Sequence, residues 1–257
     1  LSAGTCSGCS LDGSSGCFNI LLGACAGKSL TSGYSNILIG CHAGCSLTNG
    51  IRNVIIGDRE NQPGAGGNDN TLIGWNAGRC ATNGSRNVML GCEAGQCAGG
   101  DDNFIVGHRA GSQATGLDHS IIIGAQAGCL IGAGDHNIFL GYLAGQGTGT
   151  NTDNDASENV AIGKESGVNL TDGDNNIFLG REAGKNINTG GNNIALGYEA
   201  NRYGCARNNN ISIGYRAGYT MGGHDGNIFI GKNSGSQSGT ATDNTGENNI
   251  ALGTQTL

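Results

Sequence analysis

Cysteine is the most reactive side chain that this sequence offers in quantity. The chain holds 11 cysteines, and nine of them precede residue 100. Proteins kept in a reducing compartment rarely gather so many, so an oxidising, extracellular setting is favoured. Cys6-Ser-Gly-Cys9 could in principle supply two zinc ligands, but neither a second Cys-x-x-Cys nor a nearby histidine pair accompanies it. A stapled N-terminal loop is therefore the better interpretation than a metal site, and the odd count leaves one thiol, for which isolated Cys205 is a candidate.

Other candidate ligands are explained more simply as solvated turns. Residues 151–155 alternate Asn, Asp and Asp as in a calcium loop, but the glycine and the closing glutamate of such a loop are missing. His119 and His136 are each preceded by aspartate and could pair on a metal, although exposed turn residues account for them as well. We expect no bound metal and no cofactor.

Three glutamates, Glu165, Glu182 and Glu199, recur at equal intervals along the chain. Lys164 and Arg181 stand beside the first two, which favours a charged, solvated edge over a catalytic carboxylate group. The sequence contains no Gly-x-Ser-x-Gly elbow, Walker loop or metalloprotease motif. We therefore expect that the protein is not an enzyme.

The elements that position these side chains come from a repeat. Its unit reads Asn, apolar or β-branched, apolar, apolar, Gly, two variable residues, Ala, Gly, as in residues 36–44 and 176–184. The first glycine of each unit is called the anchor here. Most anchors follow a 17-residue period, with one interval of 16 and two of 22. The anchors are Gly23, Gly40, Gly57, Gly74, Gly91, Gly107, Gly124, Gly141, Gly163, Gly180, Gly197, Gly214, Gly231 and Gly253.

The repeat predicts an all-β fold rather than helices. Each apolar run is three residues long, rich in Ile, Val and Phe, and closed by glycine, and several glycines per unit exclude a helix pair. Each 17-residue unit is expected to form one coil of a parallel β-solenoid, a β-roll or β-helix of about 14 coils. Coils stacked about 4.8 Å apart would give a rod of roughly 65–70 Å.

Two columns are expected to form structural ladders along the stack. Asparagine stands four residues before the anchor in 13 of 14 units, with Ser120 as the exception. Stacked asparagines can hydrogen-bond from coil to coil, and the anchor glycine permits a positive φ or a close backbone approach. Alanine three residues after the anchor and the residue seven after it, such as Leu170, are expected to fill a thin core. The ladder residues include Asn36, Asn53, Asn70, Asn87, Asn137, Asn176, Asn193, Gly40, Gly57, Gly74, Gly180 and Gly197.

The middle residue of each three-residue run is apolar in 13 of 14 units. Alternation along a strand places this residue on the face opposite its two neighbours, and a solitary rod would expose a polar residue there. We therefore expect an outward apolar stripe that is buried between chains, with a coil folded over the stripe as the alternative. The stripe includes Leu38, Ile55, Leu72, Met89, Phe139, Phe178 and Phe229.

These phrases resemble two families of surface fibres. Asn193-Ile-Ala-Leu-Gly197 and Asn159-Val-Ala-Ile-Gly163 are similar to the head repeats of trimeric autotransporter adhesins. The 17-residue period with Gly214-Tyr-Arg-Ala-Gly218 is closer to repeats of phage-type tail fibres. The resemblance implies β-roll coils side by side in a parallel trimer used for attachment. Two features depart from it, because adhesin head repeats are usually shorter than this period and neither family is normally rich in cysteine.

Domain limits and one disulfide also follow from the spacing. Residues 1–18 are expected to form a partial, cysteine-rich first coil, and residues 19–257 a single solenoid domain with insertions near 146–156 and 236–246. Residues 1–4 are expected to follow a missing anchor, so that the chain starts and stops within coils. Cys80 and Cys97 both stand six residues after their anchors, and coil stacking brings their Cα atoms within disulfide range.

Composition limits the class of partner. The net charge is −7, 51 of 257 residues are glycine, and no apolar run approaches the ~18 residues of a membrane span. Neither nucleic acid nor a membrane span is expected. The leading hypothesis is a structural shaft or head of a fibre, extracellular or on a cell or virion surface, whose partners are its own copies and an unknown receptor or glycan. The alternatives are a filament subunit that polymerises end to end and, more remotely, an ice-binding solenoid.

Overall fold

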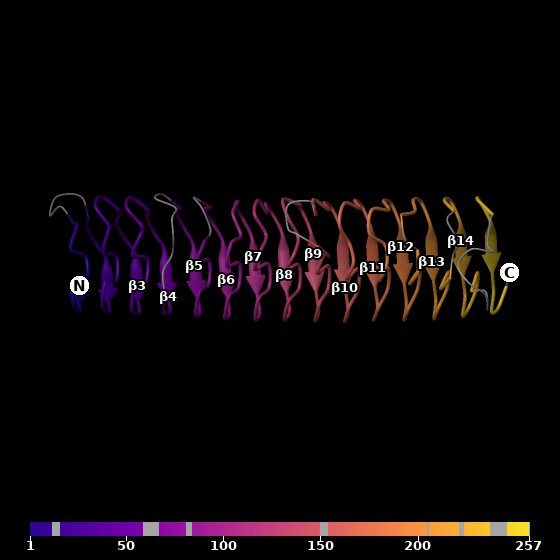
Figure 1. The fold of residues 1–257 in the computed structure, drawn as a ribbon, viewed down its shortest axis with the longest axis horizontal. Coiled ribbons are helices and arrows are strands. Elements are labelled where there is room, and N and C mark those ends of the chain that lie inside the picture. Colours follow the sequence, from indigo (N-terminus) through magenta and orange to yellow (C-terminus); the bar gives the residue numbers. More distant parts are fainter. Residues whose placement is uncertain are drawn as a thin grey trace. The chain divides into compact units, whose positions relative to one another are not determined.

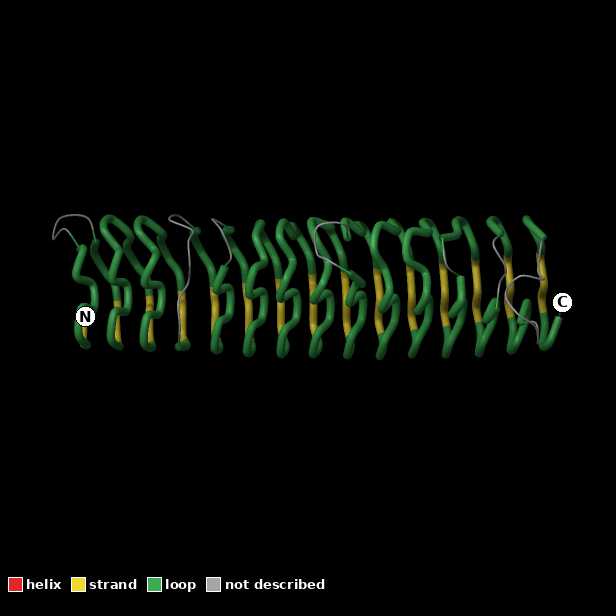
Figure 2. The backbone as a smooth tube through the Cα atoms, in the orientation of Figure 1, coloured by secondary structure: helices red, strands yellow, loops and turns green. Residues whose placement is uncertain are grey.

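The computed structural model describes residues 1–11, 16–58, 67–80, 84–149, 154–204, 206–220, 224–236 and 246–256. The predicted insertions near 146–156 and 236–246 therefore lie partly outside the described residues. Fifteen short strands alternate with turns, and the described segments contain no helix (Figure 2). The strands are β1 (Ser2–Ala3), β2 (Ile20–Leu22), β3 (Ile37–Ile39), β4 (Val54–Ile56), β5 (Thr71–Ile73), β6 (Val88–Leu90), β7 (Phe104–Val106), β8 (Ile121–Ile123), β9 (Ile138–Leu140), β10 (Val160–Ile162), β11 (Ile177–Leu179), β12 (Ile194–Leu196), β13 (Ile211–Ile213), β14 (Ile228–Ile230) and β15 (Ile250–Leu252).

The chain forms two compact units, Leu1–Ile123 with β1–β8 and Gly124–Leu257 with β9–β15. Within each unit, every strand pairs in parallel with the next strand along the chain (Figure 1). The register places equivalent repeat positions side by side, so that Phe178 of β11 lies opposite Ala195 of β12. The fold is thus an all-β parallel β-solenoid whose coils follow the 17-residue period of the repeat.

The anchor glycines allow the coils to stack closely. Gly197 has a φ of +133°, and a Cβ built on it would lie 2.5 Å from the carbonyl oxygen of Gly214 in the next coil. This distance is shorter than any that a real Cβ atom makes with a carbonyl oxygen, and L-residues rarely adopt that φ. The glycine ladder predicted from the sequence is therefore required by both the backbone angle and the space available.

The asparagine ladder runs inside the coils of each unit. Asn176 is fully buried, and its Oδ1 accepts hydrogen bonds from the backbone N–H of Asn193 at 2.9 Å and from the Nδ2 of Asn193 at 3.0 Å. The Nδ2 of Asn176 donates to the carbonyl oxygen of Gly190 at 2.8 Å and to the Oδ1 of Asn159 at 3.0 Å. The same hydrogen bonds join asparagines of other neighbouring coils, such as Asn36 and Asn53, which confirms the predicted ladder. Each asparagine of this column is called a rung of the ladder. Ser120 keeps one contact of this pattern, since its backbone N–H still donates to Asn103.

The core inside each coil is thin and is filled from two opposite walls. Alanines three residues after the anchor, such as Ala183, are buried, as are residues seven after it, such as Leu170. Both assignments confirm the prediction. The middle residues of the strands fill the remaining interior, and the largest fully buried side chains are Phe139, Phe178 and Phe229.

This burial shows that the prediction of which strand face points outward was wrong. The residues assigned to an interchain stripe point into their own coil, and those flanking them point outward. The reason is the asparagine column: Asn176 and Phe178 are two residues apart in extended chain, so they share a face, and the asparagine must be inside to complete its hydrogen bonds. The residues concerned are Leu38, Ile55, Leu72, Met89, Phe139, Phe178 and Phe229.

The first residues also differ from their predicted place. Ser2–Ala3 forms a strand paired with β2, and Gly4 has the anchor's φ of +131°. Residues 1–4 are therefore the strand and anchor of a coil rather than the residues after a missing anchor. The interval from Gly4 to Gly23 departs from the period, and the apolar run ahead of Gly4 is short, which hid this coil from the repeat pattern. No described helix is long and apolar enough to cross a membrane.

Candidate interaction surfaces

The outward face of the strands carries an apolar residue at almost every position. The first and third residues of β9–β15 are all Ile, Leu or Val, and in β2–β8 only Thr71 departs from apolar character. All of these side chains are half-exposed or exposed. The outward face, defined as the first and third residues of each strand from β2 to β15, is thus an apolar surface on each unit.

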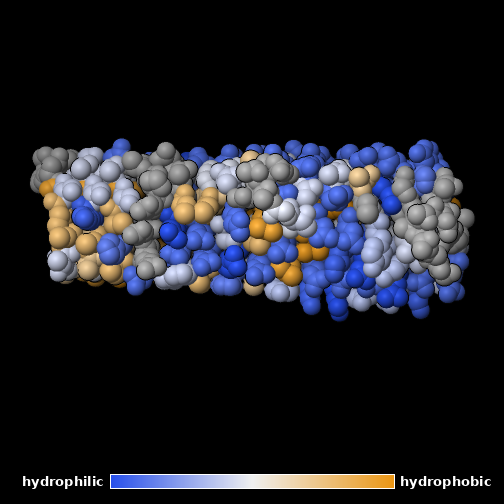
Figure 3. Space-filling view, viewed as in Figure 1, coloured by the Kyte–Doolittle hydropathy of each residue, from blue (hydrophilic) through white to orange (hydrophobic). Residues whose placement is uncertain are grey.

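This face is large for a chain of this size. Ile177 and Leu179 are each 39% exposed, and Ile250 and Leu252 exceed 60%. Side chains of this size and exposure give β9–β15 an apolar face on the order of 900 Å², above the several hundred Å² that monomers usually expose. By contrast, hydrophilic residues dominate the side of β11–β14 seen in Figure 3.

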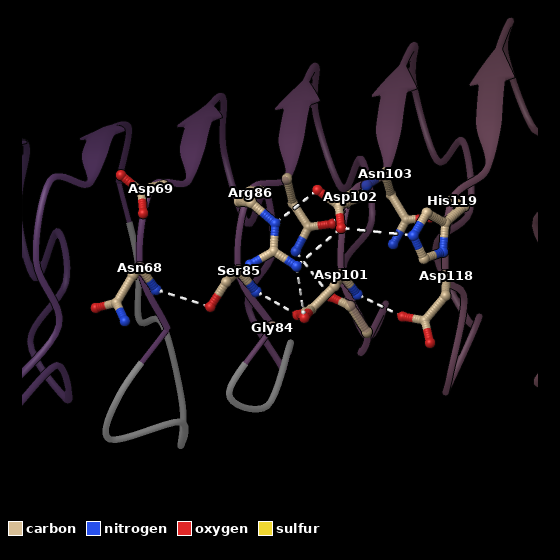
Figure 4. A network of polar contacts seen from close by, with 12 residues as sticks. Asn68, Asp69, Gly84, Ser85, Arg86, Asp101, Asp102, Asn103, Asp118 and His119 are labelled. Atoms are coloured by element: carbon tan, nitrogen blue, oxygen red, sulfur yellow. Dashed lines mark hydrogen bonds and ion pairs between the residues drawn. The ribbon is translucent and has the colours of Figure 1, made fainter.

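A row of alternating charges follows one edge of the first unit. Residues five before successive anchors are Arg52, Asp69, Arg86, Asp102 and His119. The Arg86 guanidinium lies between two carboxylates, with Nη2 at 2.9 Å from Asp101 and Nε at 2.7 Å from Asp102 (Figure 4). This pairing lowers the pKa of Asp102. The His119 ring lies 3.7 Å from the same Asp102 carboxylate, so this histidine belongs to the charge row.

The neighbouring column uses its side chains to hold the backbone of the preceding coil. Asp101 accepts the backbone N–H of Ser85 at 2.8 Å, and Ser85 accepts that of Asn68 at 3.2 Å (Figure 4). Exposed ion pairs such as Arg86–Asp102 contribute little individually. This edge therefore serves mainly to align successive coils.

The glutamate column of the second unit is not the solvated edge that the sequence suggested. Glu182 and Glu199 are 4% and 3% exposed. Arg202 lies between them, with Nη2 at 2.7 Å from Glu182 and Nη1 at 2.9 Å from Glu199. Lys185 lies 2.6 Å from Glu165 and lowers the pKa of that carboxyl. These cations stand five residues after the anchors, and that spacing is the signal by which the sequence could have revealed the pairing.

Tyrosines cover this charge cluster. The Arg202 guanidinium lies 5.2 Å from the ring centroid of Tyr203, and its Nη1 donates to the Tyr219 hydroxyl at 3.1 Å. Tyr203 and Tyr219 meet edge to face at 5.2 Å, and Tyr198 stacks on Tyr215 at 5.3 Å. Such cation–π and aromatic contacts add stability beyond area burial. The cluster therefore holds the Tyr203 ring in place at the surface.

A shallow cavity of about 380 Å³ lies beside Tyr203. Its other described lining residues are Thr148, Asn169, Asn186 and Asn188, so each lining side chain that the structure describes is polar or aromatic and uncharged. We call this cavity the asparagine groove. Asn169, Asn186 and Tyr203 share the column six residues after the anchor, but nothing in the repeat marks this column as hollowed, so the groove could not be predicted from the sequence.

The cysteines of the first unit are thiols in the structure. Cys80 and Cys97 lie within hydrogen-bonding range of each other, and burial together with this contact raises the pKa of Cys97 to about 11. The Cys9 thiol is hydrogen-bonded to Cys6, and this contact favours the protonated form and raises the pKa of Cys9. A raised pKa keeps a thiol protonated and slow to react at neutral pH. Cys205, the predicted isolated thiol, lies outside the described residues.

We expect Cys80 and Cys97 to form a disulfide when the protein is purified from an oxidising compartment, because their thiols are already adjacent. Native alkylation followed by intact-mass analysis measures this. The expected result is that Cys80 and Cys97 escape alkylation until the protein is reduced and are recovered in one non-reduced, cross-linked peptide. Alkylation of both thiols before reduction would contradict it.

Among the described residues, no three His, Cys, Asp or Glu side chains gather in a way that could hold a metal ion. Comparison with protein-family models, curated proteins and solved structures finds no match to this chain.

Proposed function

We propose that this protein is a structural repeat protein, forming the shaft or head of an extracellular or virion surface fibre used for attachment. Its coils would associate side by side through the outward face, most simply as a homotrimer of the adhesin-head or tail-fibre type. The outward face carries this proposal. The concentration of cysteines supports an oxidising location.

The outward face has the properties that a stable interface needs. Its area in β9–β15 is close to the ~800 Å² per partner of a standard interface. It is apolar and regular, since Ile, Leu and Val repeat once per coil in register. A face built this way on one chain fits the same face on a second copy, because the spacing between coils is the same in both.

The buried ladders supply the stiffness that a shaft requires. Within each unit, each coil is tied to the next by strand pairing, by the asparagine column and by backbone bonds such as that from Gly197 N–H to the Leu179 carbonyl at 2.8 Å. Stability in such a repeat is approximately a sum of local terms between neighbouring coils. A pull along the stack is therefore resisted at every coil.

Sedimentation equilibrium on the oxidised protein tests the proposal. A trimer of the 25.8-kDa chain would sediment at about 77 kDa. Ile177→Glu places a charge on the outward face and is expected to yield monomer, since an unpaired carboxylate would be buried in the interface. Thr189→Glu is the matched control, because Thr189 is exposed away from the strands, and it is expected to remain trimeric.

A wild-type protein that stays monomeric at high concentration would overturn side-by-side association. An Ile177→Glu protein that remains trimeric would show that another surface makes the contact. Circular dichroism on each variant confirms that the solenoid is intact when the mass is compared.

A further inference from the structure

We propose that the asparagine groove of the second unit binds a neutral saccharide. This inference goes beyond the structural role and does not depend on self-association. It rests on the cavity beside Tyr203 and on the chemistry of the four other side chains that line it, Thr148, Asn169, Asn186 and Asn188.

The amides of the groove present both donors and acceptors. Asn169 Nδ2 donates to Asn186 Oδ1 at 2.6 Å, which orients both amides. The backbone N–H of Thr189 donates to Asn188 Oδ1 at 2.9 Å and orients the third. Within the described part of the chain, Asn169 Oδ1 is then left as an acceptor, and the Nδ2 groups of Asn186 and Asn188 as donors. A sugar hydroxyl both donates and accepts, so it matches this mixed set.

Tyr203 adds an aromatic wall. Tyr203 is 37% exposed, and contacts with Arg202 and Tyr219 hold its ring in position. A rigid ring is amphipathic and contributes contact area with little loss of side-chain entropy. The apolar C–H face of a pyranose can pack against such a ring while its hydroxyls reach the amides.

The charges near the groove argue for a neutral ligand. The nearest cations, Lys185 and Arg202, are paired with Glu165, Glu182 and Glu199 at 2.6–2.9 Å. Their charge is therefore compensated within the protein and offers little to a phosphate or a carboxylate. None of the lining side chains that the structure describes is aliphatic, so an apolar ligand would gain little from them. The volume of about 380 Å³ is at the lower end of ligand sites, which suits one or two sugar rings.

Saturation-transfer NMR on the intact protein tests this assignment. The probes are the methyl glycosides of glucose, galactose, mannose and N-acetylglucosamine at millimolar concentration, with methyl glucuronide and methyl sialoside as acidic comparators. We expect at least one neutral glycoside to bind. Tyr203→Ala and Asn186→Ala should each weaken its affinity by about tenfold or more, because they remove central contacts.

Tyr142→Ala is the matched control, since Tyr142 is an exposed tyrosine of the same unit that does not line the groove. It should leave the affinity unchanged. Ile177→Glu should also retain saccharide binding as a monomer, which separates this inference from the proposed fibre. Asn186→Ala removes only an amide, so it keeps the test valid if Tyr203→Ala perturbs the fold.

Three results would overturn the proposal. The first is that no neutral glycoside of the panel binds. The second is that binding is unchanged in folded Tyr203→Ala and Asn186→Ala proteins. The third is that only the acidic comparators bind, which would assign the site to the cations instead of the amides.

Discussion

Replacing the anchor Gly197 with alanine is expected to destabilise the second unit by about 3 kcal/mol or more. The new Cβ would lie 2.5 Å from the carbonyl oxygen of Gly214, and the φ of +133° is strained for any residue with a side chain. The clash is with backbone that is itself fixed by the next coil, so neither partner can move away. Urea unfolding followed by circular dichroism measures the loss.

Gly191→Ala is the control for this substitution. Gly191 does not have a positive φ. A Cβ built on it would lie 3.1 Å from the Asp174 carbonyl oxygen, its nearest neighbour, and a small shift relieves this contact. We expect a change of less than about 1 kcal/mol at this position. Equal stability of Gly197→Ala and Gly191→Ala proteins would show that the anchor does not control coil stacking.

Removing one rung of the asparagine ladder is expected to have a comparable effect. Asn176→Ala deletes the acceptor for the Asn193 backbone N–H and the donor to the Gly190 carbonyl, both inside the coil. Each buried group left without a partner costs about 1–3 kcal/mol, so we expect a total of roughly 3–5 kcal/mol. In a unit of this size the melting temperature should fall by several degrees for each kcal/mol of stability lost. Thermal unfolding followed by circular dichroism measures this fall.

Two variants make this experiment specific. Asn249→Ala removes a half-buried rung, where water can replace the lost bonds, and should cost less. Asn176→Ser imitates Ser120, whose hydroxyl donates to the Asp118 carbonyl oxygen at 3.2 Å, and its cost should fall between those of the two alanine variants. If Asn176→Ala were no more costly than Asn249→Ala, the ladder would contribute nothing beyond strand pairing.

Much of the fold follows from local rules that a periodic sequence repeats many times. A three-residue apolar run closed by glycine can only be a short strand and a turn, and a constant interval forces each strand to lie beside its equivalent. The buried alanines and residues such as Leu170 also follow, because small and branched residues in a fixed column must pack on the same column of the next coil.

The main wrong prediction was which face of the strand points outward, and the sequence contained the information to predict it correctly. Asn176 and Phe178 share one face of the chain, so a buried amide ladder requires a buried phenylalanine and an outward Ile177 and Leu179. Apolar residues occupy both faces of the strand, so hydrophobicity by itself did not distinguish inside from outside. The polar residue determined the orientation.

The candidate sites depend on distances between side chains of different columns, and the repeat period does not predict these distances. Glu182 and Glu199 share one column and Arg202 stands in another, and the curvature of the turn brings Arg202 between the two carboxylates. The asparagine groove likewise joins Thr148 with Asn186 and Tyr203 from different coils.

The sequence by itself determined the repeat, the parallel solenoid and the two ladders, because each results from contacts between identical positions in adjacent coils. Only the tertiary structure decided which charges are buried and where a groove opens. Those features depend on how the turns bend each coil, and the bend is set jointly by several positive-φ positions, such as Glu199 at +53°, that residue type does not reveal.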